Sequence, residues 1–169
     1  MVLIGLMDRF TIRNVKMEDL PQLVIIENLC FPKEEAATEE AFKKRIQLIP
    51  DSFFVAEQTG QLIGLINGPV IHTKYITDDL FGKIKANPPA GGHQSILGLA
   101  VSPKFQKYGV ATALLAHLEK EAKKNNRETI TLTCNEDLIR FYKKLGYHNC
   151  GVSDSNHAEG LWYNMIKKL

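Results

Sequence analysis

The apolar positions of this chain follow two periodicities, and the shorter of them predicts strands. Residues that alternate between apolar and polar, or that form short continuous apolar runs, are typical of half-buried and buried strands. The clearest hairpin signal is Gln58-Thr59-Gly60, which joins two such segments. Strands are expected at 10–15, 53–57, 61–67, 95–101, 129–134, 147–152 and 161–166.

Apolar residues spaced by three or four positions predict helices. Asp19 is the expected N-cap of the first helix, Pro21 lies in its first turn, and Cys30-Phe31-Pro32 ends it. Thr38 is the expected N-cap of a second helix, which ends at Pro50.

Two further helices are expected in the second half of the chain. Every fourth residue from Val110 to Ala122 is apolar, which indicates an amphipathic helix. Asn135 is the expected cap of the last helix, and Gly146 suits the left-handed position that follows a helix end.

The order of these elements predicts an α/β (α+β) fold in a single domain. We expect a mixed, mostly antiparallel sheet of about six or seven strands, flanked by about four helices, with one parallel crossover in the middle. Residues 1–8 are expected to form an N-terminal extension. Residues 69–94 are expected to form a long active-site loop, because connections of that length are usually functional.

Composition narrows the class of protein. The 169 residues suffice for one domain, and 44% hydrophobic and 24% charged residues are ordinary for a globular chain. The cysteines (Cys30, Cys134 and Cys150) and the five histidines lack metal-ligand spacing, so no metal is expected. Reduced thiols indicate a cytoplasmic location.

No membrane contact is expected, since no apolar run approaches the ~20 residues of a membrane span. The apolar residues 1–7 lack the basic region and cleavage site of a signal peptide.

Positive charge gathers in one segment of the chain. Residues 101–147 carry nine Lys and Arg against five Asp and Glu, whereas residues 1–100 carry ten against twelve. Such a segment suits a small polyanionic ligand. Nucleic-acid binding is not expected, because it requires denser basic clusters interleaved with aromatic residues.

The loop Gln106-Lys107-Tyr108-Gly109-Val110-Ala111 joins the apolar strand at 95–101 to the helix that follows it. A short loop of this kind leaves several backbone N–H groups unpaired at the positive end of the helix dipole, where a diphosphate can bind. It is not the phosphate loop of nucleotide triphosphatases, which needs Gly-Lys-Ser/Thr. Nor is it the dinucleotide fingerprint, which needs three spaced glycines.

The spacing Gln/Arg-x-x-Gly-x-Gly/Ala in this loop resembles the coenzyme A (CoA) pyrophosphate loop of the GCN5-related N-acetyltransferase (GNAT) superfamily. Asn135 followed by Phe141-Tyr142-Lys143-Lys144-Leu145-Gly146-Tyr147 resembles a second segment of that family, and the element order resembles its fold. The likeness covers nearly the whole chain from residue 10 onward. It implies an acetyl-CoA-dependent N-acetyltransferase in which the amine attacks the thioester directly, in a ternary complex.

The resemblance also implies roles for individual residues. Tyr142 is expected to be the catalytic acid that protonates the departing thiolate. Gly98 is expected to form a bulge that frees neighbouring backbone groups for the pantetheine arm. The residues expected to bind the cofactor are Leu99, Ala100, Val101, Gln106, Lys107, Tyr108, Gly109, Val110, Ala111, Thr112, Asn135 and Phe141.

Cys30-Phe31-Pro32-Lys33-Glu34-Glu35-Ala36 resembles the amine-pocket loop of the arylalkylamine N-acetyltransferases and their bacterial relatives. This implies a small arylalkylamine-like primary amine as the acceptor. The animal enzymes of that group carry two histidines on the fourth strand, where this chain has Ser95 and Leu97, so the base is not assigned. Acceptor contacts are expected at Phe31, Pro32, Glu35, His93 and Ser95.

Two other functions fit the same residues. One is acetylation of a protein N-terminus or lysine side chain, which an open groove would suit. The other is a non-catalytic acyl-CoA-binding sensor, since the strand histidines are missing. The polar alternating C-terminal strand also allows a homodimer, paired strand to strand.

Overall fold

The computed structural model describes residues 10–81, 83–154 and 160–169. Residues 1–8, expected to form an N-terminal extension, lie outside the described part. The α-helices are α2 (Leu20–Cys30), α3 (Glu39–Leu48), α4 (Val110–Lys124) and α5 (Ile139–Lys144). The short 3-10 helices are η1 (Met17–Asp19), η2 (Pro50–Ser52), η3 (Asp78–Phe81), η4 (Pro103–Phe105) and η5 (Glu136–Leu138). The strands are β1 (Thr11–Asn14), β2 (Phe53–Gln58), β3 (Gln61–Asn67), β4 (Val70–Ile71), β5 (His93–Ile96), β6 (Gly98–Val101), β7 (Thr129–Cys134), β8 (His148–Val152) and β9 (Tyr163–Lys168).

The strands form two sheets rather than one. Four strands in the order β1-β2-β3-β6 are antiparallel throughout. Five strands in the order β4-β5-β7-β9-β8 contain one parallel pair, β5 with β7, which α4 connects. The α/β (α+β) class and its parallel crossover are therefore confirmed. Within the described ranges, no helix is long and apolar enough to cross a membrane.

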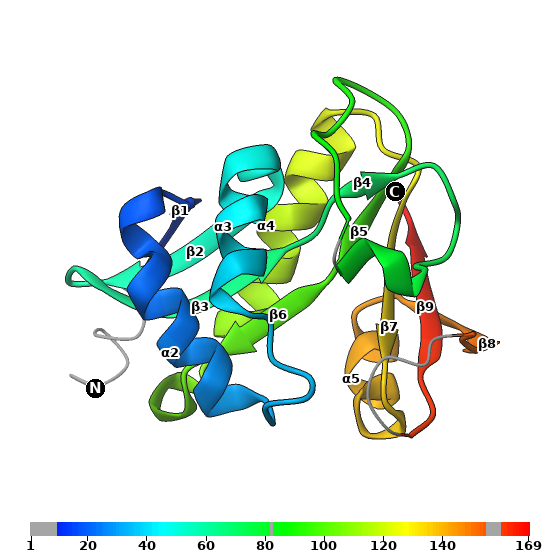
Figure 1. Ribbon diagram of the computed structural model, residues 1–169. Coiled ribbons are helices and arrows are strands. Elements are labelled where there is room, and N and C mark those ends of the chain that lie inside the picture. Colours follow the sequence, from blue (N-terminus) through cyan, green and yellow to red (C-terminus); the bar gives the residue numbers. More distant parts are fainter. Residues whose placement is uncertain (1–9, 82, 155–159) are drawn as a thin grey trace.

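The four-stranded sheet separates two apolar cores (Figure 1). Phe53 and Val55 of β2 pack with the buried residues of α2 and α3, whereas Phe54 and Ala56 pack with those of α4. This division follows from the two-residue period of a strand, whose successive side chains point to opposite faces. Helices therefore cover both faces of this sheet.

The apolar segment 95–101 divides into two strands at Leu97. β5 pairs with β7, whereas β6 pairs with β3 of the other sheet, so the chain changes sheets between Ile96 and Gly98. A Cβ on Gly98 would lie 3.3 Å from the side-chain nitrogen of Asn67, so glycine allows the close approach of β3 here. The irregularity expected at Gly98 is thus a switch between sheets. Beyond it, β6 and β7 run apart (Figure 1).

Residues 69–94 are more ordered than the sequence pattern indicates. This segment contains β4, η3 and the start of β5, so it is not one uninterrupted loop. β5 begins at His93 because this polar residue and Gln94 pair with β4 on one side and β7 on the other. Because these two side chains are polar, the pattern of apolar residues does not predict that the strand includes them.

The C-terminal strand β9 lies between β7 and β8. Both of its edges are occupied, so two chains cannot pair through it as the sequence suggested, and β8 is the edge strand on that side. The homodimer itself stays a prediction.

Thr38, Gly146 and Asp19 hold the helix-end positions expected of them, and Asn135 is the N-cap of η5, which leads directly into α5. Thr38 Oγ1 accepts a hydrogen bond from the Ala41 N–H at 3.1 Å, and Gly146 has a φ of 95°. Asp19 and Asn135 precede their helices but make no capping hydrogen bond with their side chains. Asp19 makes no such bond because its carboxylate accepts from Arg13 and Lys16 instead.

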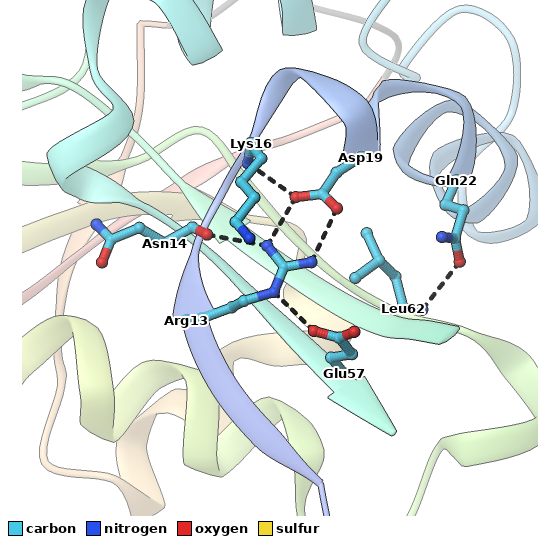
Figure 2. Close-up of polar contacts among 7 residues, drawn as sticks. All are labelled: Arg13, Asn14, Lys16, Asp19, Gln22, Glu57 and Leu62. Atoms are coloured by element: carbon cyan, nitrogen blue, oxygen red, sulfur yellow. Dashed lines mark hydrogen bonds and ion pairs between the residues drawn. The ribbon is translucent and has the colours of Figure 1, made fainter. Parts of the chain in front are cut away.

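Arg13 of β1 ties three segments together through its guanidinium group (Figure 2). Two of its nitrogens donate to the two carboxylate oxygens of Asp19 at 2.9 Å each, and its Nε donates to Glu57 of β2 at 2.6 Å. The Lys16 backbone N–H also donates to Asp19, at 2.8 Å. Burial alone would raise the pKa of Asp19, but the bonds from Arg13 and Lys16 outweigh it and hold that pKa below its ordinary value.

Replacing this carboxylate, Asp19→Asn, is expected to lower the free energy of unfolding by about 1.5–3 kcal/mol near pH 7, because charged hydrogen bonds are lost. The pKa of Asp19 is lower in the folded than in the unfolded state. Its contribution is therefore full above about pH 4 and disappears as the pH falls through the folded-state pKa. Denaturant unfolding of both proteins between pH 7 and pH 2 measures the effect. The control is Glu18→Gln, at an exposed neighbour. A loss from Asp19→Asn that is the same at every pH would contradict the electrostatic account.

Candidate functional site

The loop before α4 has the backbone conformation of an anion cradle. Lys107 and Gly109 both have positive φ, 69° and 85°, and Gly109 is the residue that precedes the first turn of α4. The Ala113 N–H donates to the Gly109 carbonyl at 3.0 Å, so the three helical N–H groups before Ala113 have no acceptor within the helix. These groups lie at the positive end of the helix dipole and can hold a diphosphate.

A groove of about 560 Å³ runs from this loop along β6 to α5. Three of the residues expected to bind the cofactor do not line it: Ala100 is buried against α2 and α3, Tyr108 is 58% exposed, and Asn135 lines a neighbouring cavity. The Gln106 side-chain amide donates to the Val101 carbonyl at 3.0 Å, so it braces the loop. The expected residues that do line the groove are Leu99, Val101, Gln106, Lys107, Gly109, Val110, Ala111, Thr112 and Phe141.

β6 presents a backbone edge to this groove. The Ser102 N–H donates to the Ile63 carbonyl of β3 at 2.8 Å, next to the paired residue Val101. In an antiparallel pair, only every second residue of a strand bonds to the neighbouring strand. Since Ser102 bonds to β3, the N–H and C=O groups of Leu99 and Val101 point away from β3. β7 does not pair with β6, so these groups face the gap between the two strands. The Val101 carbonyl already accepts from the Gln106 amide and, at 3.1 Å, from the Cys30 thiol, so an extended ligand with amide groups can bond to the outward groups of Leu99 and to the Val101 N–H.

Tyr142 of α5 lies at the end of the groove. Its side chain is 5% exposed, and its ring packs edge-on against Phe141 and Tyr147, at centroid distances of 5.0 and 5.5 Å. Burial, and after it the neighbouring Cys134 sulfur, raise the pKa of Tyr142. The hydroxyl is therefore protonated at neutral pH and can act as a proton donor.

A second, smaller cavity of about 130 Å³ adjoins the groove. Leu99, Leu138 and Tyr142 line both spaces, so the two are separated only by shared walls. Phe31 and Glu35, both expected as acceptor contacts, line the smaller cavity. Its other walls come from distant parts of the chain, and they are Glu27, Phe81, Ile96, Leu97, Gly98, Leu132, Thr133, Cys134, Asn135 and Trp162.

Glu27, Thr133 and Trp162 are the polar wall residues that sequence reasoning missed. Glu27 is 4% exposed, and its Oε2 accepts a hydrogen bond from the Ala37 N–H at 2.8 Å. Burial raises the pKa of Glu27, although the Ala37 N–H and the charge of Arg45 act in the opposite direction. A signal was present in the sequence: Glu27 stands four residues after Leu23, on the buried stripe of α2, where a charged residue is unusual.

Three residues expected to contact the acceptor lie away from this cavity. His93 Nδ1 lies 2.8 Å from the Thr129 hydroxyl, and its other ring nitrogen lies 3.5 Å from a Glu128 carboxylate oxygen. Ser95 is fully buried and donates to the Pro69 carbonyl at 2.5 Å. Pro32 is exposed and contributes only its carbonyl to the turn after α2. The structure therefore brings Phe31 and Glu35 to the site and leaves these three outside it.

The described residues contain no cluster of three or more His, Cys, Asp or Glu side chains that could hold a metal ion. The three cysteines are free, and Cys134 lines the smaller cavity with a pKa raised to about 11 by burial. A thiol with so high a pKa is a poor nucleophile at neutral pH.

The sequence is similar to a family of enzymes and to individual proteins. Residues 20–147 match the model of the Acetyltransferase (GNAT) family. Over 155 residues the chain is 29% identical to an N-alpha-acetyltransferase of Sulfurisphaera tokodaii, in an alignment that covers 89% of this chain and 87% of that protein.

Solved structures have the same fold. Ard1 from Thermoplasma volcanium superposes with a TM-score of 0.74 at 21% identity, covering 95% of this chain and 97% of that one. The GphF GNAT-like decarboxylase, in complex with isobutyryl-CoA, superposes with a TM-score of 0.79 at 18% identity, covering 94% and 98%. Since the family model spans well over half of its residues, the chain belongs to the Acetyltransferase (GNAT) family and is an acetyl-CoA-dependent acyltransferase.

Proposed function

We propose that this acyltransferase acetylates the α-amino group at the N-terminus of a polypeptide. The observation that carries the proposal is the volume of the acceptor cavity, about 130 Å³. Pockets that enclose a whole small molecule usually measure ~300–1,000 Å³. A cavity this small suits the first residue of a chain whose remainder stays outside. The likeness to an N-alpha-acetyltransferase along 89% of this chain supports the same acceptor, in place of the small arylalkylamine that the sequence indicated.

In this proposal the groove beside β6 holds acetyl-CoA, which supplies the acetyl group as a thioester. The N–H groups at the start of α4 bind the diphosphate. The outward backbone groups of Leu99 and the Val101 N–H bond to the amides of the pantetheine arm. The groove of about 560 Å³, its anion cradle and its unpaired strand edge fit an extended anionic ligand of this kind.

Tyr142 is proposed as the acid of the reaction, because it lines both the groove and the acceptor cavity. Its hydroxyl donates a proton to the sulfur as the C–S bond breaks. Holding the two reactants in adjoining spaces is the other contribution of the protein, and orientation of this kind can supply ~7–11 kcal/mol of the barrier.

Mass spectrometry tests the acceptor. The protein is incubated with acetyl-CoA and each of three probes: a peptide with a free N-terminus and no lysine, an N-blocked peptide with an internal lysine, and a set of arylalkylamines. We expect acetylation of the free N-terminus alone. Acetylation of lysine or of the arylalkylamines instead would overturn the proposal. Acetyl-CoA binding without transfer to any probe would also overturn it, in favour of a cofactor sensor.

The variant Tyr142→Phe tests the proposed acid. We expect kcat to fall about 100-fold or more, because general-acid catalysis of this kind contributes ~10²–10⁴-fold. The Kd for acetyl-CoA, measured by calorimetry, is expected to stay unchanged, since phenylalanine keeps the ring packing. The control is Tyr147→Phe, which removes another buried tyrosine hydroxyl, one that donates to Glu119 at 2.8 Å. Turnover of Tyr142→Phe equal to that of the control would contradict the role.

The variant Gly109→Ala tests the phosphate cradle. A Cβ on Gly109 would meet nothing within 4 Å, so the penalty comes only from its φ of 85°. An L-residue in that conformation costs about 1–2 kcal/mol, and binding must restore the loop, so we expect the Kd for CoA to rise about 5- to 30-fold. The matched control is Gly60→Ala in the β2–β3 turn, where φ is 79° and space is equally open. An unchanged Kd for Gly109→Ala would contradict the cradle.

A further inference from the structure

Two residues that line the acceptor cavity each have a buried polar atom with no hydrogen-bond partner among the residues that the structure describes. One atom is Oε1 of Glu27, and the other is Nε1 of Trp162. Both atoms are buried, and burying such a group without a partner costs about 1–3 kcal/mol, more when it is charged. An unpaired acceptor and an unpaired donor on two residues that line one small cavity indicate a ligand that supplies the complementary groups.

The first residue of a polypeptide carries both of these groups. Its ammonium is a donor, and its carbonyl oxygen, three bonds from that nitrogen, is an acceptor. Building on the function proposed above, we propose that Glu27 binds the α-ammonium group and takes its proton, while the Trp162 indole N–H donates to the first peptide carbonyl. An arylalkylamine offers no such carbonyl and would leave the indole N–H unpaired.

Glu27 is held in place by its other oxygen. Oε2 accepts from the Ala37 N–H at 2.8 Å, so the carboxylate is anchored across the turn between α2 and α3. This leaves Oε1 as the oxygen that can meet a ligand. The base that the sequence could not assign is therefore present, on α2 rather than on the strand that carries histidines in the animal enzymes.

The surroundings of Glu27 suit a proton acceptor. Arg45 of α3 is 3% exposed and donates to the Asn67 side chain at 3.1 Å. Burial lowers the pKa of Arg45 to about 10, so it stays a cation at neutral pH and favours the ionised form of Glu27. Burial and the charge of Glu27 raise the pKa of Cys30, which stays a thiol. Glu35, Cys134 and Tyr142 are the other titratable groups that line the cavity.

A raised pKa makes Glu27 a stronger base than an ordinary carboxylate. An α-ammonium group has an ordinary pKa of about 7.7–8.0, against about 10.4 for the ammonium of lysine. Transfer of the proton to Glu27 therefore costs less free energy from the α-ammonium group of a chain terminus than from the ammonium group of a lysine side chain. The chemistry of the base and the size of the cavity thus favour the same acceptor.

The protons balance over one turnover. Glu27 takes one proton from the ammonium, which leaves a neutral amine. As the amine nitrogen forms the C–N bond to the acetyl carbon and the C–S bond breaks, Tyr142 donates its proton to the sulfur. The nitrogen then gives up a second proton, which restores the Tyr142 hydroxyl. Glu27 returns its own proton to water, so each transfer releases one proton.

The variant Glu27→Gln tests the base while keeping an oxygen that can accept from Ala37. We expect kcat/KM for a free N-terminal peptide to fall at least about 100-fold, with the Kd for acetyl-CoA unchanged. The wild type is expected to react through the ammonium form, whereas the variant needs the neutral amine. The ratio of the wild-type kcat/KM to that of the variant should then rise about tenfold for each unit by which the pH is lowered from 8 to 6. The control is Glu34→Gln, at an exposed residue of the same loop.

Binding provides a readout that does not depend on turnover. Calorimetry in the presence of CoA compares the free-amine peptide with its N-acetylated form. We expect Glu27→Gln to weaken binding of the free-amine peptide about tenfold or more and to leave the acetylated peptide unaffected. Trp162→Phe removes only the indole N–H and is expected to raise KM for the peptide about 2- to 10-fold, as for the loss of one hydrogen bond.

The outcomes separate this inference from the proposed function. If the wild type acetylates no peptide N-terminus, the proposed function fails. If the wild type does so, and Glu27→Gln keeps its kcat/KM within threefold with the same pH profile, the role of Glu27 is overturned. If Trp162→Phe leaves KM for the peptide unchanged, the role of Trp162 is overturned.

Discussion

The parting of β6 from β7 is the constraint on which the rest of this structure depends. Each strand has two edges: β6 uses one for β3, while β7 uses both of its edges for β5 and β9. The chain reaches this arrangement by changing sheets at Leu97, within a single apolar segment. The unused edge of β6 then faces a gap that no backbone fills. The cofactor groove, the acceptor cavity and the position of Tyr142 all follow from that gap.

The two ends of the site differ in their electrostatics: the start of the α4 helix lies at one end and the Glu27 carboxylate at the other. At one end, the left-handed backbone of Lys107 and Gly109 turns the chain into α4 and leaves its first N–H groups without acceptors. At the other end, Glu27 lines the smaller cavity, and the charge of the buried Arg45 favours the ionised form of its carboxylate. In the proposed function, the diphosphate thus meets the positive start of α4, and the ammonium of the acceptor meets the Glu27 carboxylate.

Most of the fold could be predicted from the sequence, because periodicity reports which side of an element is buried. The hairpin, the helices and the parallel crossover all come from such patterns. The switch at Leu97 could not be predicted, since an apolar run is the same whether it stays in one sheet or enters another. Asp19 is the N-cap residue of α2 as expected, but its carboxylate binds Arg13, six residues earlier, instead of the N–H groups of the helix. A local signal cannot anticipate a partner on another element.

The cofactor side and the acceptor side of the site also differ in how far the sequence predicted their residues. The cofactor side comes from one continuous loop and strand, so spacing alone indicated most of the residues that line the groove. The acceptor side is assembled from α2, η3 and the segment before β9, which are far apart in sequence. The sequence pointed to Glu35 alone among the acceptor contacts with a charged side chain, and only the fold shows that Glu27 and Trp162 line the same cavity. A crystal structure with a peptide joined through its terminal nitrogen to CoA would test the account most directly. The account predicts the diphosphate against the start of α4, the pantetheine arm along β6 and the peptide nitrogen beside Glu27. A peptide that enters elsewhere, or a CoA moiety outside the groove, would contradict it.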